Sequence, residues 1–155
     1  MYGKKNHHGR YGMIKLSKSF WKNKKVLITG HTGFKGSWLG LVMKYFGAKV
    51  YGISLKPKYN INLYDSIKKN TFNKSYIFDL RDLKKTKNTI NKIKPEVIFH
   101  FAAQPIVSEG YKDPSNTYST NIMSTINIFE SLRSNKFCKI LLISTTDKVY
   151  EVRKN

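Results

Sequence analysis

The sequence predicts an α/β fold with a doubly wound parallel sheet of the Rossmann type, truncated after the fifth strand. Two observations predict this fold. Short apolar runs of strand length alternate with longer segments at helical spacing, and a glycine-rich turn follows the first apolar run directly. Strands that alternate with helices in this way form a parallel sheet whose crossover connections are right-handed.

The predicted elements follow one another in a regular order. Residues 25–30 form a short apolar run that stops at a glycine, as expected of a buried parallel strand. Residues 37–46 carry apolar side chains at helical spacing, and Gly47 stands where a C-terminal glycine belongs. The remaining strands are expected at residues 49–53, 75–80, 96–102 and 139–144, and the remaining helices at 62–69, 83–93 and 114–134.

The composition indicates one globular domain. The chain has 155 residues, of which 40% are hydrophobic and 14% aromatic, enough to bury one core. The single cysteine, Cys138, excludes an internal disulfide and a multi-cysteine zinc site, so we expect no metal and a reducing, cytoplasmic location. No apolar run approaches the roughly 18 residues that span a bilayer, and we expect no membrane partner.

The formal net charge of +20 raises the alternative of nucleic-acid binding. The positive charge comes from 25 Lys and only 4 Arg, spread over the whole length. Arg reads bases and clamps phosphates through two hydrogen bonds, so its scarcity argues against a specific nucleic-acid partner. Non-specific binding by the lysines remains an alternative, which predicts steep salt dependence and no response to a dinucleotide.

Two segments are expected along the chain. Residues 1–20 form a basic N-terminal extension that we expect to be disordered, and residues 21–155 form a dinucleotide-binding domain. The chain stops shortly after the fifth predicted strand, where a doubly wound sheet still lacks its second half. We therefore expect an incomplete domain, an N-terminal part from which the substrate domain is absent.

The turn after the first strand carries glycines at the spacing GxxGxxG, at Gly30, Gly33 and Gly36. In such a turn one glycine makes the tight bend, one lets the backbone approach a pyrophosphate, and one lets the helix pack on the strand. The N-terminus of the following helix offers free N–H groups and a partial positive charge to phosphates. The sequence therefore predicts a dinucleotide site at this turn.

Three further stretches are expected at the same edge of the sheet. After the third strand, Asp79 can accept a hydrogen bond from the exocyclic amine of adenine; the alternative is a solvated Asp79 beside a helix cap made by Asp82. After the fourth strand, small residues leave room for a ligand, and His100 is expected to be a packed core histidine rather than a base. Asn121, a mediocre helix former, suggests a role in bridging to backbone or water.

The fifth strand ends in a polar cluster that contains Thr146, Asp147 and Lys148. A hydroxyl, a carboxylate and an amine in succession could hold a sugar hydroxyl and exchange a proton with it. The alternative is a polar strand end that caps the next helix.

Together these stretches resemble the extended short-chain dehydrogenase/reductase family of NAD-dependent nucleotide-sugar epimerases and dehydratases. Within it, four phrases resemble the CDP-glucose 4,6-dehydratases: FWKNKKVLITGHTGFKGSWL, HFAAQPIV, TNIMST and TTDKVYE. The resemblance covers about residues 19–153. It implies NAD as the cofactor and CDP-glucose as the substrate of the full-length family member. In the implied reaction a hydride leaves C4 of the glucose for NAD, water is lost across C5 and C6, and the hydride returns to C6.

The resemblance also implies roles for single residues. The residues that would contact NAD are Gly30, Gly33, Phe34 and Gly36 at the pyrophosphate, Asp79 and Leu80 at the adenine, Phe101, Ala102 and Ala103 along the cofactor, and Thr120 near its nicotinamide half. Thr146 would hydrogen-bond the C4 hydroxyl, Asp147 would protonate the departing C6 hydroxyl, and Lys148 would stand beside it where relatives usually carry a Glu. A homodimer through the long helix after the fourth strand is a further implied partner.

Two departures from the family pattern qualify these implications. The family's Tyr-x-x-x-Lys pair should follow the TTDKVYE phrase, and the chain ends before it; Tyr150 matches the spacing in the wrong place. The second strand ends in Ser54-Leu55-Lys56, without the acidic residue that commonly binds the adenosine ribose, so NAD rather than NADP follows only from the resemblance. We expect the chain alone to lack dehydratase activity. Another dehydratase or epimerase of the family, or a non-catalytic dinucleotide-binding module, remains an alternative.

Overall fold

A computed structural model describes residues 17–146 of the chain. Its five strands form one sheet in the order β3-β2-β1-β4-β5, and every neighbouring pair is parallel. The strands are β1 (Lys25–Thr29), β2 (Lys49–Ser54), β3 (Lys74–Ile77), β4 (Val97–His100) and β5 (Ile140–Ile143). The predicted fold class is confirmed.

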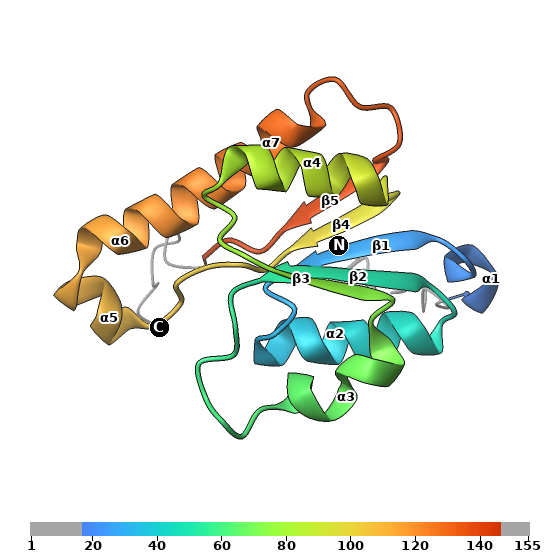
Figure 1. Cartoon of the computed structure of the whole chain (residues 1–155), viewed down its shortest axis with the longest axis horizontal. Coiled ribbons are helices and arrows are strands. Elements are labelled where there is room, and N and C mark those ends of the chain that lie inside the picture. The colour runs from blue at the N-terminus through green and yellow to red at the C-terminus, as the bar shows by residue number, and fades with distance from the viewer. Residues whose placement is uncertain (1–16, 147–155) are drawn as a thin grey trace, which may run out of the picture.

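Helices cover the two faces of this sheet. Helices α2 (Phe34–Tyr45) and α3 (Leu63–Thr71) pack on one face, and α4 (Leu83–Ile93) and α7 (Ser124–Leu132) pack on the other (Figure 1). The remaining helical segments are α1 (Lys18–Trp21), α5 (Val107–Lys112), α6 (Pro114–Tyr118) and the π-helical turn η1 (Ser119–Met123). Helices α6, η1 and α7 run on without a break, so the predicted long helix of residues 114–134 is present with a π turn inside it.

Alternation along the strands divides the core into two layers. On β1, Val26 and Ile28 face the α2 and α3 layer, whereas Leu27 faces α4 and α7. All three side chains are fully buried, as expected for a central parallel strand. The layer under α2 and α3 also contains the aromatic residues Tyr64 and Phe72, and the layer under α4 and α7 is mainly aliphatic. Both layers stabilise the position of β1, and with it the turn that follows.

Local signals in the sequence set the helix boundaries. Asn62 caps α3 by accepting a hydrogen bond from the amide of Asp65 at 2.9 Å, and Asp82 caps α4 in the same way for Lys85 at 2.9 Å. Gly47, with φ of +84°, follows the end of α2 as predicted. Helix α4 ends at Lys94 in the left-handed region, directly before Pro95.

Several elements differ from the sequence prediction. Helix α2 begins at Phe34, three residues before the predicted start, because the helix continues directly out of the glycine turn. Strand β3 ends at Ile77, which leaves Asp79 in a loop rather than at the end of the strand. Helix α5 was not predicted, and α1 begins within the stretch expected to be disordered. These short helices have no buried residue, so their sequences carry no amphipathic pattern.

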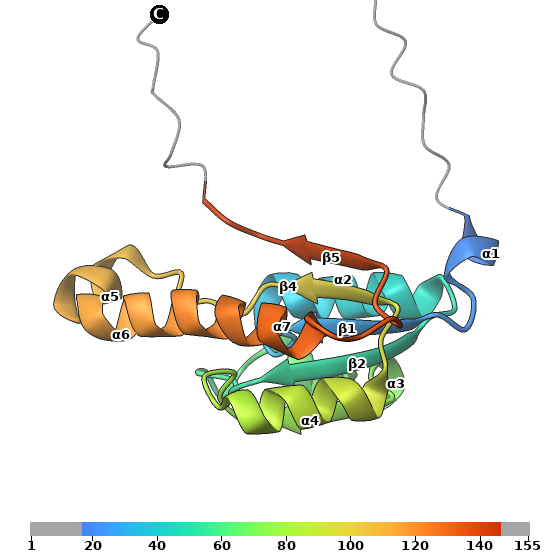
Figure 2. The same ribbon diagram turned by 90° about the horizontal axis from the view of Figure 1, so that it is seen from above.

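Strand β5 forms one edge of the sheet (Figure 2). Its register pairs Ile140 with Val97 and Leu142 with Phe99, so these side chains share the face on which α2 packs. Ile140 and Leu142 are 47% and 44% exposed, and no helix among residues 17–146 covers this corner of the sheet. Nor does any helix in that range combine the length and apolar character needed to cross a bilayer.

Candidate functional site

The glycine turn leaves the carboxyl end of β1 and leads directly into α2. Gly30 has a φ of +70°, a backbone conformation that residues with a side chain rarely adopt. A Cβ atom at Gly30 would lie 2.8 Å from the amide nitrogen of Ala102, and one at Gly36 would lie 2.3 Å from the carbonyl oxygen of Gly30. Gly30 therefore allows the turn to contact the segment after β4, and Gly36 allows the start of α2 to fold back on the turn.

Gly33 differs from the other two glycines because it faces solvent. It is the N-cap residue of α2, its amide donates to the carbonyl of Gly30 at 3.0 Å, and its own carbonyl accepts from the amide of Ser37 at 2.9 Å. Phe34 follows as the first helical residue with a side chain that is 75% exposed. The exposed end of a 12-residue helix with no side chain at its cap is a surface that a pyrophosphate can approach.

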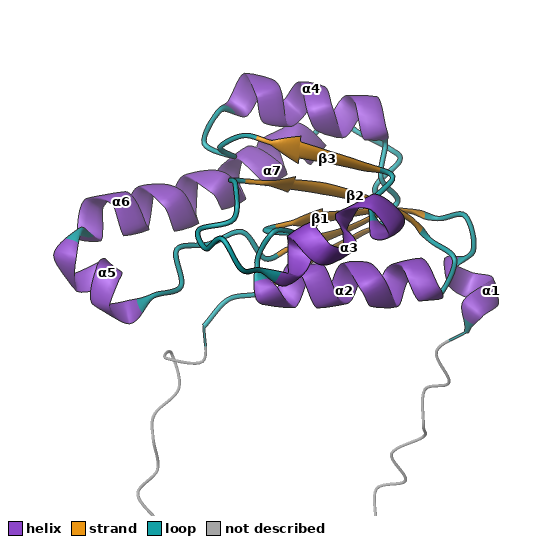
Figure 3. Ribbon diagram, turned by 60° about the horizontal axis from the view of Figure 1, so that its bottom comes forward, coloured by secondary structure: helices purple, strands orange, loops and turns teal. Residues whose placement is uncertain are grey.

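Residues 101–103 follow β4 and meet this turn, because β4 runs parallel to β1 and both strands end at the same edge of the sheet. Figure 3 shows this sheet between α2 and α3 on one side and α4 and α7 on the other. Thr29 is fully buried at the end of β1, and its hydroxyl accepts from the amides of Phe101 and Ala102, both at 3.1 Å. With both lone pairs occupied, the Thr29 hydroxyl donates to Nδ1 of His100 at 2.7 Å. The segment that the resemblance places along the cofactor is thus fixed to β1 by a side chain that the sequence analysis did not identify.

This bond fixes the tautomer of His100. Because Nδ1 accepts from Thr29, the proton lies on Nε2, which faces the hydroxyl of Thr125 at 3.2 Å; that hydroxyl in turn donates to the carbonyl of Asn121 at 2.8 Å. Burial lowers the pKa of His100 to about 4, so the ring is neutral. His100 is the packed core histidine that the sequence predicts, and it links β1 to the π turn.

The π turn holds the loop after β4. Asn121 accepts from the amide of Gln104 at 2.7 Å and donates to the Gln104 carbonyl at 3.3 Å, which confirms its predicted bridge to backbone. The Gln104 side chain donates to the hydroxyl of Thr117 at 2.9 Å. Thr120, in the same turn, is half-buried and lies 3.5 Å from the amide oxygen of Asn116. Helical turns of this type are frequent at functional sites.

The loop after β3 carries Asp79, Leu80 and Arg81. Both oxygens of Asp79 accept from Arg81: Oδ1 from its amide at 2.9 Å, and Oδ2 from Nε at 2.9 Å and Nη2 at 2.6 Å. The Arg81 guanidinium therefore holds the pKa of the Asp79 carboxyl below its usual value. Leu80 is only 4% exposed and packs in the core with α4, so only its backbone could contact an adenine.

The glycine turn is also fixed to the end of β2. The Thr32 hydroxyl donates to the carbonyl of Leu55 at 3.0 Å and accepts from the Ser54 hydroxyl at 2.9 Å. Beyond this point an open hollow of about 410 Å³ is lined by the loop after β2 and by α3, with Lys56, Tyr64, Asp65 and Lys68 among the lining residues. Asp65 is paired with Lys68 at 2.6 Å.

The polar cluster after β5 is only partly described. Thr146 is exposed in the segment that leaves the carboxyl end of β5, and the amide of Ser144 donates to the carbonyl of His100 at 3.1 Å. Asp147 and Lys148 lie outside the described residues. The structure thus gathers the glycine turn, residues 101–103, the Asp79 loop and Thr146 at one edge of the sheet, while the binding roles of these residues stay predictions.

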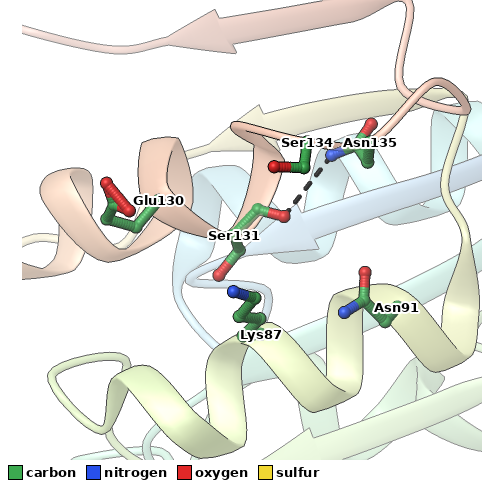
Figure 4. A pocket seen from close by; sticks show the side chains of 6 residues that line it. All are labelled: Lys87, Asn91, Glu130, Ser131, Ser134 and Asn135. Atoms are coloured by element: carbon green, nitrogen blue, oxygen red, sulfur yellow. Dashed lines mark hydrogen bonds between the residues drawn. The ribbon is translucent and has the colours of Figure 1, made fainter.

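A second hollow lies elsewhere. It measures about 160 Å³ and is lined by polar side chains of α4 and of α7 with the loop after it (Figure 4). The side chains of Lys87, Ser131 and Asn135 lie around it, and the Asn135 amide reaches the Ser131 carbonyl at 3.5 Å. It lies between two helices rather than at the carboxyl edge of the sheet, and we assign it no part in the site. Among residues 17–146 there is also no group of three His, Cys, Asp or Glu side chains that could hold a metal ion.

Comparison with known proteins places this fold and this edge in one family. A family model described as GDP-mannose 4,6 dehydratase matches residues 27–151. This range includes the glycine turn, the loops after β3 and β4 and the polar cluster after β5. The chain belongs to this family.

The family's members differ in their similarity to the chain. A CDP-glucose 4,6-dehydratase of Salmonella typhimurium is 42% identical over 139 residues, covering 90% of this chain and 39% of that protein. A GDP-mannose 4,6-dehydratase of Vibrio cholerae is 29% identical over 134 residues, covering 83% of this chain and 34% of that protein. The chain thus spans about two fifths of the length of the first relative and one third of the second.

Solved structures agree on the fold. A UDP-glucose-4-epimerase from Stenotrophomonas maltophila, solved with bound NAD and formylated UDP-arabinopyranose, superposes with a TM-score of 0.75 at 21% identity. The superposition covers 86% of this chain and 40% of that one. At this identity the likeness establishes the architecture, and the chemistry has to be argued from the residues.

Proposed function

We propose that this chain is the NAD-binding part of a CDP-glucose 4,6-dehydratase. The observation that carries the proposal is the difference in identity between two relatives of similar coverage, 42% for the CDP-glucose enzyme and 29% for the GDP-mannose enzyme. The phrases that the sequence analysis assigned to the CDP-glucose branch fall on the glycine turn, the end of β4, the π turn and the end of β5. These are the segments that meet at the carboxyl edge of the sheet.

The residues at this edge fit NAD. The exposed Gly33 and the N-terminus of α2 can receive its pyrophosphate, with Phe34 beside it. Asp79 would face the adenine, and Ala102, Ala103 and Thr120 would lie along the other half. NAD, when bound, supplies the acceptor and the donor of a hydride. The supporting observation is that a Cβ atom at Gly30 or Gly36 would collide with backbone, so the turn has the close packing that a backbone cradle requires.

The catalytic roles rest on the segment after β5. Thr146 would hydrogen-bond the hydroxyl at C4 of the sugar, Asp147 would protonate the hydroxyl that leaves C6, and Lys148 would stand beside Asp147. The exposure of Thr146 at the same edge as the glycine turn supports its role. The roles of Asp147 and Lys148 rest on the family resemblance.

A chimera tests whether this chain supplies the NAD-binding and catalytic half of the reaction. Residues 1–155 are joined to the remaining part of the Salmonella relative. The chimeric protein is then incubated with NAD and with CDP-glucose, GDP-mannose or dTDP-glucose. We expect CDP-glucose to be the main substrate that loses one water, and mass spectrometry measures this loss. Thr146→Val should lower turnover by about 100-fold, since loss of one preorganised hydrogen bond to a reacting oxygen costs about 10²–10³-fold. Thr145→Val, at the neighbouring exposed position, is the matched control.

The outcomes separate the alternatives. An active chimera with the remaining part of the Vibrio relative, beside an inactive one with the Salmonella part, would contradict the CDP-glucose assignment and leave another member of the family. An inactive chimera, together with calorimetric binding of NAD by the 155-residue chain, would support a non-catalytic dinucleotide-binding module. Absence of NAD binding would contradict the proposal as a whole.

We also propose that the protein forms a homodimer through the outer face of the long helix. Apolar side chains spaced three and four residues apart share this face and remain 43–67% exposed: Tyr118, Ile122, Ile126 and Phe129. Sedimentation analysis should show a dimer that Ile122→Asp converts to monomer. A monomeric parent chain, or a dimer unaffected by Ile122→Asp, would contradict this interface.

A further inference from the structure

Arg81 occupies an unusual place at the edge of the candidate site. Its amide, Nε and Nη2 all donate to the carboxylate of Asp79, two residues earlier. Two guanidinium N–H groups hold Oδ2 and the backbone amide holds Oδ1, so the carboxylate is restrained in orientation and its charge is paired. Asp79 therefore cannot rotate freely, although its side chain is 35% exposed.

The other end of the guanidinium reaches the long helix. Nη1 of Arg81 donates to the amide oxygen of Asn116 at 3.0 Å and approaches the hydroxyl of Ser119 at 3.4 Å. Asn127, in α7, donates to the carbonyls of Leu80 and Arg81 at 2.8 and 2.9 Å. The loop after β3 is thus held by α6, η1 and α7, with Arg81 as the side chain that joins Asp79 to the helix.

The hydrogen bonds leave one oxygen of Asp79 with spare capacity. A carboxylate offers about four acceptor sites, two on each oxygen. Arg81 fills two on Oδ2 and one on Oδ1. Among the described residues no other donor reaches Oδ1, so a second donor can bind there without displacing the arginine.

We propose that Arg81 is a positioning residue that presents Oδ1 of Asp79 to the exocyclic amine of the adenine. The inference rests on the proposed binding of NAD and deepens it, because it assigns the selection of adenine over other purines to an Asp79–Arg81 unit. The same pair has little reason to exist for stability, since ion pairs at this exposure contribute little to folding. It confers orientation instead.

The test compares NAD with nicotinamide hypoxanthine dinucleotide, in which a carbonyl oxygen replaces the amine. Calorimetry on the 155-residue chain should show that NAD binds about tenfold or more tightly, because the bound analogue would cover Oδ1 of Asp79 without offering it a donor. Arg81→Met should reduce this ratio to about threefold or less without a matching fall in melting temperature, and Arg81→Lys should restore part of it. Asp79→Asn, whose amide can donate to a carbonyl, should shift the preference toward hypoxanthine.

Lys85→Met is the matched control. Lys85 is an exposed residue on α4 whose amine pairs with Asp82 at 3.3 Å, so its loss removes the same charge without touching Asp79. It should leave the ratio unchanged. An unchanged ratio in Arg81→Met, with NAD still bound, overturns the inference and leaves the proposed function intact; failure of the parent chain to bind NAD overturns both. If Arg81→Met does not fold, the ratio in Asn116→Ala decides, because that variant removes a partner of the guanidinium and should also lower the preference.

Discussion

Two buried histidines lie on opposite faces of the sheet and differ in what surrounds their ring nitrogens. His100 has hydroxyl partners at both ring nitrogens, Thr29 at 2.7 Å and Thr125 at 3.2 Å. His31, in the glycine turn, has no hydrogen bond of ordinary geometry to either nitrogen from any described residue. Its ring instead stands edge-on to Tyr64 and Phe72, at centroid distances of 5.1 and 4.9 Å.

The difference shows two ways of keeping an imidazole neutral. Desolvation lowers the pKa of both rings to about 4. In His31 the backbone of Ile53 raises the pKa and so offsets part of this lowering. His100 is held by a network that orders the segment after β4, whereas His31 is held by the shape of an aromatic pocket closed by Gly52. The environment of His100 is therefore sensitive to the loss of a hydrogen bond, and that of His31 to any added atom that narrows its pocket.

The largest expected effect concerns pH. Each ring has an ordinary pKa of 6.5 and a folded-state pKa of about 4, so between these values the unfolded chain binds more protons than the folded one. The free energy of unfolding should therefore fall as pH decreases from 6.5 to 4, by on the order of 3 kcal/mol for each histidine. Urea denaturation at several pH values measures it.

The carboxylates contribute little to the change in the free energy of unfolding between pH 6.5 and 4. The lowered pKa values of Asp65, Asp79 and Asp82 make their contribution disappear only below the ordinary value of 3.8. His31→Leu should remove about half of the pH dependence between 6.5 and 4. If His31→Leu kept the full pH dependence of the free energy of unfolding, the ring of His31 would be protonated in the folded state over this range, with a pKa that burial does not lower.

Gly52→Ala should be the most damaging of the substitutions. A Cβ atom there would lie 2.2 Å from the ring of His31, which has no room to move between Tyr64 and Phe72. We expect a loss of about 3 kcal/mol in the free energy of unfolding, measured by urea denaturation. Gly110→Ala, whose Cβ would meet its nearest neighbour at 3.8 Å, is the control and should be neutral or mildly stabilising. Equal stability of the two variants would show that the pocket around His31 is loose.

Replacing each histidine by leucine at pH 7 should separate the two environments. His100→Leu leaves the Thr29 hydroxyl without its acceptor and should cost about 2 kcal/mol in the free energy of unfolding. His31→Leu removes two nitrogens without a hydrogen-bond partner in the described part of the chain, and should change the free energy of unfolding by less than about 1 kcal/mol. Thermal or urea denaturation measures both, and a larger loss in His31→Leu would reverse the comparison.

The smallest effect is expected at the far end of the His100 network. Thr125→Val removes the partner of Nε2 and the donor to the Asn121 carbonyl while keeping the shape of the side chain. Because this end is half-buried and accessible to water, the cost should be about 1 kcal/mol. Hydrogen exchange at the amide of Gln104, which Asn121 accepts, should quicken in the same variant. Unchanged exchange would show that the network stops at His100.

Much of the architecture could be predicted from local pattern. Apolar runs such as residues 25–30 indicated the strands, and Asp82 and Gly47 marked helix boundaries because capping depends on one residue and its immediate neighbours. The glycine spacing located the turn because the backbone tolerates no Cβ atom at Gly30 and Gly36. The π turn inside the long helix was not predicted, since its hydrogen bonds shift by one residue without changing the apolar spacing.

The candidate site divides in the same way. The sequence by itself determined which strand ends carry polar or small residues, and parallel topology then brought them to one edge. Only the tertiary structure decided that Thr29 bonds His100, that Arg81 bonds Asn116, and that His31 has no hydrogen bond of ordinary geometry to its ring nitrogens from residues 17–146. The first of these contacts joins residues 71 positions apart, and the Arg81 bond to Asn116 joins residues 35 apart. No local pattern encodes such pairs, because each depends on how strands and helices pack in three dimensions.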